Sequence, residues 1–400
     1  MNMKTVLTVL QGVTTYKDIL TLPVMEKALR LLTSTVHGDG LGGLEAYTDL
    51  FYQLRQEGYA GLGIWLGDAL RWSEGPYPRL AERGERDLVL EQAARLDISA
   101  FEMLASVDCD HWLAQLRRLL DSDYQGVITS LPRWRSGVPF SFEALTEAYQ
   151  REGAGRFARC RAFVWDSGEL IPVAHPDCPT SNQLLGYEEQ RAEVERNTRA
   201  LVEGRYVNNV LLYGESGTGK SATVKNLLTL PGMEELRIIE ADKENLGGLP
   251  ALIRTLDGRR QKFIVFIDDL TFDRDDPTYS VLKTILEGGV ERRPRNVAVY
   301  ATSNRRHLVR QTISERAGDE MDRSETIREK TSLADRFGLR VLFQGLNKTE
   351  YLDLVDMLAQ QHGIWLPSEE LHRQAAAWER FHAAQTPRTA LQFILSLSPH

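Results

Sequence analysis

Residues 209–221 read Asn-Val-Leu-Leu-Tyr-Gly-Glu-Ser-Gly-Thr-Gly-Lys-Ser, an apolar run that leads directly into a glycine-rich loop. The loop, Gly214–Ser221, fits the pattern G-x-x-x-x-G-K-[S/T] throughout, and a helical pattern follows to about Leu230. Glycines allow backbone N–H groups to turn toward an anion, and the positive end of the helix dipole adds to the attraction. This strand, loop and helix therefore predict a site for the phosphates of a nucleoside triphosphate.

The loop offers groups suited to a nucleotide and a cation. Lys220 provides a point charge for the β and γ oxygens, and the Ser221 hydroxyl is a ligand for Mg²⁺, so we expect ATP and Mg²⁺ to bind. The residues expected to contact the nucleotide are Gly214, Ser216, Gly217, Thr218, Gly219, Lys220, Ser221 and Thr223. A G-x-S-x-G nucleophile elbow is excluded, because Thr218 stands where its second glycine would be.

A second apolar run, Phe263–Asp268, ends in two acids, Asp268 and Asp269. In a parallel sheet the carboxyl ends of the strands meet at one edge, so these acids are expected beside the phosphate loop. We expect Asp268 to hold Mg²⁺ together with Ser221. We expect Asp269 to orient the attacking water and accept its proton.

A third strand pattern ends in Ala301-Thr302-Ser303-Asn304. Asparagine after a strand is by itself more often a turn or cap residue. Because this strand follows the Asp268 strand in chain order, its end should reach the same edge of the sheet. We therefore expect Asn304 to contact both the γ-phosphate and the water.

Short β-rich runs alternate with helical patterns after residue 208, which indicates a parallel sheet. The strands expected are Val210–Tyr213, Arg237–Ala241, Phe263–Asp268, Val297–Ala301 and Arg340–Phe343. A hairpin is expected over 162–173, a charged helix over 187–203, and helices over 348–362, 367–383 and 387–397. Upstream, helical periodicity marks 23–32, 44–56, 87–96 and 111–120. We therefore predict an α/β fold with a mostly helical N-terminal domain (1–175), a P-loop core (176–345) and a helical lid (346–400).

Composition narrows the class of protein. With 42% hydrophobic and 26% charged residues among 400, the chain is typical of folded water-soluble proteins with more than one domain. A net charge of -8 gives no global positive field for coating nucleic acid. The cysteines Cys109, Cys160 and Cys178 lack metal or redox spacing, and the run Val6–Leu10 is too short for a signal or membrane segment. We expect a cytoplasmic protein that does not enter the membrane.

Several motifs together resemble a bacterial family of predicted AAA+ ATPases, P-loop NTPases whose cellular function is unassigned. They lie between about Phe163 and Leu395. The runs that carry the resemblance are Asn208–Gly214, Phe266–Leu270, Leu286–Val290, Tyr300–Leu308 and Ser332–Leu339.

The resemblance implies further site residues. Gly186 and Tyr187 match the segment that packs near adenine, Arg336 matches the arginine finger, and Arg388 matches the sensor 2 arginine that reports the γ-phosphate to its own subunit. A finger from a neighbouring subunit neutralises transition-state charge only where two subunits adjoin. A homo-oligomer, either a ring or a filament, is therefore implied, with hydrolysis coupled to assembly.

The function stays open between two classes. One is an ATP-hydrolysing motor that remodels a partner recognised by the N-terminal domain. The other is a nucleotide-dependent switch, loader or scaffold with little turnover, which Asp269 favours because most AAA+ proteins have the longer glutamate there. The chain departs from the family pattern at a second position, since Pro387 stands where the family usually has a glycine, next to Arg388. A small-molecule kinase is disfavoured, because the chain has a finger-like Arg336 and a lid.

Basic residues give weaker signals. We favour subunit contact for Arg292, Arg293, Arg295, Arg305 and Arg306, with a pore or substrate contact and a solvated face as alternatives. Trp134, between two arginines, reads as a surface turn rather than a base-stacking platform. Nucleic-acid binding is possible on this reading but unsupported.

Overall fold

The computed structural model describes residues 2–272, 277–287, 293–304, 333–382 and 384–397. The chain divides into two compact units, Met1–Arg159 and Cys160–His400. Each unit is described by itself below.

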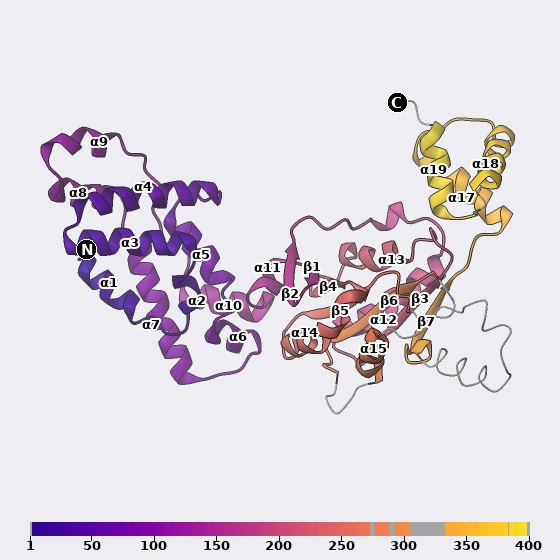
Figure 1. Cartoon of the computed structure of the whole chain (residues 1–400), viewed down its shortest axis with the longest axis horizontal. Helices are drawn as coiled ribbons and strands as arrows, with labels where there is room; N and C mark the ends of the chain where they lie inside the picture. Colours follow the sequence, from indigo (N-terminus) through magenta and orange to yellow (C-terminus); the bar gives the residue numbers. More distant parts are fainter. Residues whose placement is uncertain (1, 273–276, 288–292, 305–332, 383, 398–400) are drawn as a thin grey trace. The chain divides into compact units, whose positions relative to one another are not determined.

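The first unit is helical, as the sequence predicts (Figure 1, indigo to magenta). Its helices are α1 (Met3–Gln11), α2 (Lys17–Leu20), α3 (Pro23–His37), α4 (Gly40–Gln56), α5 (Leu62–Arg71), α6 (Pro76–Glu82), α7 (Leu88–Ala105), α8 (Cys109–Leu119), α9 (Gln125–Ser130), α10 (Phe142–Glu152) and α11 (Arg156–Arg159). Side-chain caps start several of them: Asp39, Asp87 and Asp108 each accept hydrogen bonds from the first turn of their helix.

The core of this unit holds large aromatic side chains. Trp112, Tyr16 and Tyr47 are fully buried. The ring of Trp134 packs on Tyr47 with 4.7 Å between centroids, and Trp134 is 5% exposed. The prediction of a surface turn was therefore wrong for this residue, because its ring fills a core position between the flanking arginines.

The second unit is built on a seven-stranded sheet with the order β2-β1-β4-β5-β6-β3-β7. The strands are β1 (Ala162–Asp166), β2 (Glu169–Val173), β3 (Val210–Gly214), β4 (Leu236–Ala241), β5 (Lys262–Ile267), β6 (Val297–Ser303) and β7 (Leu339–Phe343). All neighbouring pairs are parallel except the β1–β2 hairpin. β3, which leads into the phosphate loop, lies between β6 and β7, so the polar end of β6 with Thr302 and Ser303 lies beside the loop.

Helices cover both faces of the sheet. They are α12 (Glu188–Val202), α13 (Lys220–Asn226), α14 (Leu249–Leu256) and α15 (Pro277–Glu287). Val194 of α12 and Val224 of α13 share one core with Leu212 and Phe266. In Figure 1, α14 and α15 lie on the opposite side of the strands from α13. Strands buried on both faces explain why they are continuously apolar.

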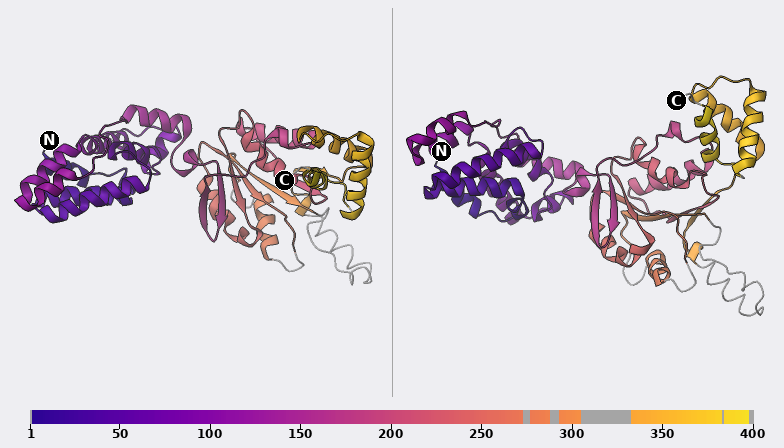
Figure 2. Two further views of the ribbon diagram at one scale, coloured as in Figure 1. Left: turned by 90° about the horizontal axis from the view of Figure 1, so that it is seen from above. Right: turned by 45° about the horizontal axis from the view of Figure 1, so that its top comes forward.

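The lid consists of α17 (Lys348–Gln361), α18 (Ser368–His382) and α19 (Pro387–Leu397). These helices pack on one another in both views of Figure 2, around a core that includes Leu354, Ala375 and Phe393. A reciprocal pair of hydrogen bonds between Asn347 and Glu350 caps the start of α17. All three lid helices predicted from the sequence are present.

The hairpin β1–β2 belongs to the second unit, since β1 pairs in parallel with β4, from Ala162 opposite Ile238 to Trp165 opposite Ala241. The two compact units therefore divide after Arg159, ahead of the boundary expected at 175. Burial of Phe163 and Trp165 at the sheet ties the hairpin to the P-loop core.

Candidate functional site

The phosphate loop has the backbone that its glycines permit. Gly214, Gly217 and Gly219 have φ of 137°, 81° and 90°, a region that side-chain-bearing residues rarely adopt. At Gly214 a Cβ atom would also lie 2.0 Å from the Phe343 carbonyl oxygen of the adjacent strand β7. Gly219 precedes the first residue of α13, so the loop opens onto a helix N-terminus.

Lys220 lies under the loop and is 5% exposed. Its Nζ donates to the carbonyl oxygens of Gly214 (3.0 Å) and Glu215 (2.6 Å). Burial lowers the pKa of its ammonium group, while the nearby carboxylates of Asp268 and Asp269 act in the opposite direction. A lysine ammonium has three N–H donors, so one remains for a phosphate oxygen.

Ser221 and Asp268, both expected to hold Mg²⁺, lie in direct contact. The Ser221 hydroxyl donates to Asp268 Oδ1 at 2.6 Å. Thr302, on β6, donates its hydroxyl to the same oxygen. A hydroxyl and a carboxylate at the mouth of a phosphate loop are the oxygen ligands that Mg²⁺ prefers.

Asp269 and Asn304 also meet. The Asn304 side-chain amide donates to Asp269 Oδ1 at 2.8 Å. Asp269 has φ of 48°, and its backbone N–H donates to Thr302 Oγ1 at 2.9 Å. Both side chains are exposed and line the same cavity as Lys220.

The lid closes one side of this cavity, which has a volume of about 470 Å³. The backbone N–H of Arg388 donates to the Gly217 carbonyl at 3.2 Å, so the start of α19 is bonded directly to the phosphate loop. A Cβ atom on Gly217 would lie 3.0 Å from Thr386 Oγ1 and 3.1 Å from Arg388 Cβ. Pro387, in place of glycine, begins α19 without displacing Arg388 from the cavity.

A model of the family described as "Protein of unknown function (DUF815)" matches residues 158–400, more than half of the chain. The protein belongs to this family. The match begins within two residues of the start of the second compact unit, which holds the mostly parallel sheet, the phosphate loop and the C-terminal helices. No curated protein matches the chain.

Among solved structures, this DUF815 protein is similar to Thermotoga maritima RuvB, described as a Holliday junction branch migration motor. The identity is 16% and the TM-score 0.36, over 54% of this chain and 63% of that chain. A single-residue variant of the same RuvB gives 16% identity and a TM-score of 0.37, over 53% of this chain and 61% of that chain. The chain thus spans less than two thirds of the length of these structures.

Not every predicted site residue of the DUF815 protein lies at the cavity. Gly186 and Tyr187 are not among the described residues that line it; the segment just before them, Gln183, Leu184 and Leu185, is. The Tyr187 hydroxyl instead donates to the Gln344 carbonyl at 2.6 Å, and burial raises its pKa to about 12.

Two hydroxyls of the loop region have structural partners. Thr218 Oγ1 donates to the Glu215 carbonyl and Thr223 Oγ1 to the Gly219 carbonyl, each at 2.9 Å. Both side chains are buried and neither is among the residues that line the cavity. Arg336 precedes β7 and is also not among the described residues that line the cavity.

The five arginines expected to contact a neighbouring subunit do not share one environment. Arg293 donates both to Asn209 Oδ1 and to the Val207 carbonyl, and burial lowers its pKa, so its guanidinium is bonded within its own chain. Arg295 is exposed, while Arg292, Arg305 and Arg306 lie outside the described residues. Within the described part of the chain, no helix is long and apolar enough to cross a membrane.

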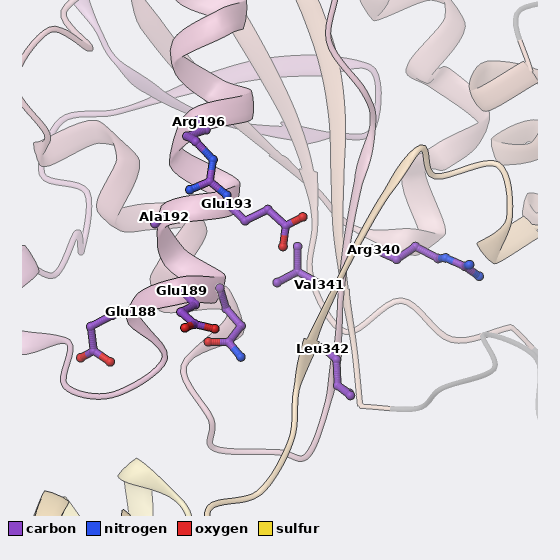
Figure 3. A pocket seen from close by; sticks show the side chains of 9 residues that line it. Glu188, Glu189, Ala192, Glu193, Arg196, Arg340, Val341 and Leu342 are labelled. Carbon is purple, nitrogen blue, oxygen red and sulfur yellow. The ribbon is translucent and has the colours of Figure 1, made fainter.

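A second hollow, of about 700 Å³, lies between α12 and the edge strand β7 (Figure 3). Glu193 of α12 extends toward Val341 across it, and Arg196 of the same helix also lines it. None of the predicted site residues lines this hollow, whose described lining includes the carboxylates of Glu188, Glu189 and Glu193 and no part of the phosphate loop. The cavity at the phosphate loop is therefore the candidate active site.

Proposed function

We propose that this protein is an AAA+ ATP hydrolase that binds Mg-ATP and uses turnover to remodel a partner. One arrangement supports this most: Ser221 bonded to Asp268, beside Asp269 bonded to Asn304, in one cavity. A phosphate loop alone would suit kinases, transporters and motors equally. A carboxylate held by an amide next to it provides what an attacking water needs, an acceptor for its proton and a second polar contact.

Different residues around the cavity would contact the phosphates and the base of the nucleotide. Backbone N–H groups of Gly214–Ser221 and the remaining N–H of Lys220 would hold the phosphates. An apolar wall suited to the base is formed by Leu184 and Leu185, which lie before α12, and by Leu354 of the lid helix α17. Arg388 lies on the lid side, where it can sense the γ-phosphate.

The donor set fits Mg²⁺. The described residues contain no group of three or more His, Cys, Asp or Glu side chains that could hold a metal ion, and Mg²⁺ commonly needs only one carboxylate together with phosphate and water. Ser221 and Asp268 would hold it. When bound, Mg²⁺ neutralises charge on the β- and γ-phosphate oxygens.

The proposal also covers how the protein assembles and which unit binds its partner. Arg336 lines no part of its own subunit's cavity, which is consistent with a finger that completes the site of a neighbour in a homo-oligomeric ring or filament. The helical unit before Cys160 would bind the partner protein, and the protein would act in the cytoplasm.

The test is ATP turnover by the full-length protein with Mg²⁺. Lys220→Ala should lower kcat/KM at least about 100-fold, because it removes a charge that contacts the transferred phosphate. Lys225→Ala is the matched control, since Lys225 lies on the same helix and pairs with Glu240 at 3.3 Å on the surface. Wild-type protein without ATPase activity, or an unaffected Lys220→Ala variant, would refute the proposal.

The second candidate is a nucleotide-dependent switch with little turnover. It is favoured by the short side chain of Asp269, whose carboxylate is already bonded to Asn304. Size-exclusion chromatography with light scattering, with and without ATP, separates the two. A switch changes its assembly on binding ATP while product formation stays at background, whereas a motor shows both assembly and turnover.

A further inference from the structure

We propose that Thr302 is a positioning residue whose hydroxyl sets the two acids of the nucleotide site relative to each other. The inference deepens the proposed function and rests on it. Sequence patterns gave no reason to select this residue, because threonine is common in strands. Its role comes from three hydrogen bonds on the described residues around the carboxyl end of β6.

The Thr302 side chain is 2% exposed. Its hydroxyl donates to Asp268 Oδ1 and accepts the backbone N–H of Asp269 at 2.9 Å. A hydroxyl has one hydrogen, so these two bonds use its donor and one acceptor position in opposite directions. The Thr302 carbonyl accepts the N–H of Leu270 at 2.7 Å, so one residue ties down three consecutive residues after β5.

The first consequence concerns Asp268. Its Oδ1 accepts two hydroxyls, Ser221 at 2.6 Å and Thr302, which arrive from different elements. Two donors to one oxygen fix the rotation of the carboxylate. Without Thr302, the Ser221 hydroxyl and a longer bond from the Asp269 backbone N–H (3.2 Å) would remain, and the carboxylate would be held less firmly in the position suited to a cation.

The second consequence concerns Asp269. Its φ of 48° is a left-handed conformation that residues with a side chain seldom adopt, so the surroundings must hold it. The bond from its N–H to Thr302 does so, together with a longer one to Asp268 Oδ1 at 3.2 Å. In this conformation the Asp269 carboxylate meets the Asn304 amide. Thr302 thus positions both Asp268, the expected Mg²⁺ ligand, and Asp269, the expected proton acceptor.

The experiment compares Thr302→Val and Thr302→Ser in the full-length protein. Valine keeps the shape and removes the hydroxyl, and serine keeps the hydroxyl. Thr198→Val is the matched control: Thr198 is also buried, and its hydroxyl bonds to Val194 and to Tyr300 on β6, away from the cavity. For each variant we would measure the Tm, the affinity for a fluorescent ATP analogue with and without Mg²⁺, the Mg²⁺ concentration for half-maximal turnover, kcat and KM.

Thr302→Val should lose most of the gain in nucleotide affinity that Mg²⁺ gives, roughly tenfold for a bond to a charged group, while affinity without Mg²⁺ stays within about twofold. Its kcat should fall on the order of 100-fold, because water orientation depends on Asp269, and its KM for Mg-ATP should rise by no more than about tenfold, in line with the lost affinity. Thr302→Ser should behave as wild type, and Thr198→Val should change only the Tm.

The inference is overturned if Thr302→Val retains wild-type Mg²⁺ dependence and kcat, if Thr302→Ser is equally impaired, or if Thr198→Val reproduces the defect. These results differ from failure of the proposed function, in which the wild-type protein itself neither binds nor hydrolyses nucleotide. If the wild type binds nucleotide with Mg²⁺ but does not turn it over, the binding measurements alone decide.

Discussion

At the scale of single residues, Asp269 is the group whose reach decides between turnover and simple binding. Asp269→Asn removes the negative charge that accepts a proton from water but keeps an oxygen for the Asn304 bond. We expect kcat to fall about 100-fold or more, with ATP affinity within about twofold, since the phosphate contacts lie elsewhere. Steady-state kinetics and equilibrium binding measure the two quantities. Asp257→Asn, an exposed acid at the end of α14 outside the cavity lining, should be silent.

A retained cellular function with Asp269→Asn would contradict the motor and support the switch. Asp269→Glu tests whether the length of this side chain limits turnover. If side-chain length limits turnover, Asp269→Glu should raise kcat; if the left-handed backbone at this residue sets the geometry, Asp269→Glu should lower it.

The sequence anticipated the residues that its strand ends bring together. Asp268, Asp269 and Asn304 could be predicted because parallel strands end at one edge of the sheet, and their mutual contacts agree with that expectation. Thr302 could not, since the use of a hydroxyl depends on where neighbouring strands place their polar groups. Gly186 and Tyr187 were predicted from the resemblance alone, and the residues that line the cavity are the three just before them, Gln183, Leu184 and Leu185.

At the scale of elements, Asn296 joins a helix to two strands. Asn296 lies just before β6, and its buried side-chain amide donates to the carbonyl of Leu256 at the end of α14 (2.8 Å). It also donates to the carbonyls of Arg259 and Gln261 (3.2 Å each), which lie between α14 and β5. Asn296→Ala leaves these carbonyls without that donor. We expect it to lower the free energy of unfolding of the second unit by about 1–3 kcal/mol.

Urea denaturation checks this expectation, read out on the second unit. Asn245→Ala serves as the control, because its amide donates to Asp166 Oδ1 at 3.1 Å on the surface, and the loss of this exposed bond should cost less than about 0.5 kcal/mol. Equal destabilisation by the two variants would show that the buried amide is not what holds α14 to the sheet.

The elements themselves were largely predictable, and one of their pairings was not. Apolar runs gave the strands Val210–Tyr213 and Arg340–Phe343 to within a residue of β3 and β7, because fully buried strands carry a continuous local pattern. The hairpin over 162–173 was also predicted, but its place in the sheet was missed. Pairing of β1 with β4 joins residues far apart in the chain, and no local pattern records such a contact.

At the scale of the whole molecule, the helical unit is what the sequence explains least. Its Trp112 and Tyr47 are buried in the core, where they pack, and buried packing residues do not indicate which partner the unit binds. The second unit does make a prediction about assembly, because Arg336 precedes β7 and lies outside its own cavity lining. If Arg336 acts on a neighbour, a site and its finger come from different chains.

Two inactive variants should then restore each other. An Arg336→Ala subunit keeps an intact phosphate loop, and a Lys220→Ala subunit keeps an intact finger. In an equimolar mixed assembly with random neighbours, about a quarter of the head-to-tail interfaces combine an intact loop with an intact finger. ATPase activity of the mixture should therefore rise to roughly that fraction of the wild-type value, above the mean of the separate variants.

Arg340→Ala is the control for this mixing experiment, because Arg340 is an exposed arginine of β7 that pairs with Asp335 of its own chain at 2.8 Å. It should keep most of the activity by itself and should not depend on mixing. A mixture of Arg336→Ala and Lys220→Ala that gives only the mean of the two separate activities, under conditions where light scattering shows co-assembly, would place the action of Arg336 within its own subunit. Arg336 would then have to reach the cavity by a movement of the segment before β7, and turnover would no longer require a neighbour.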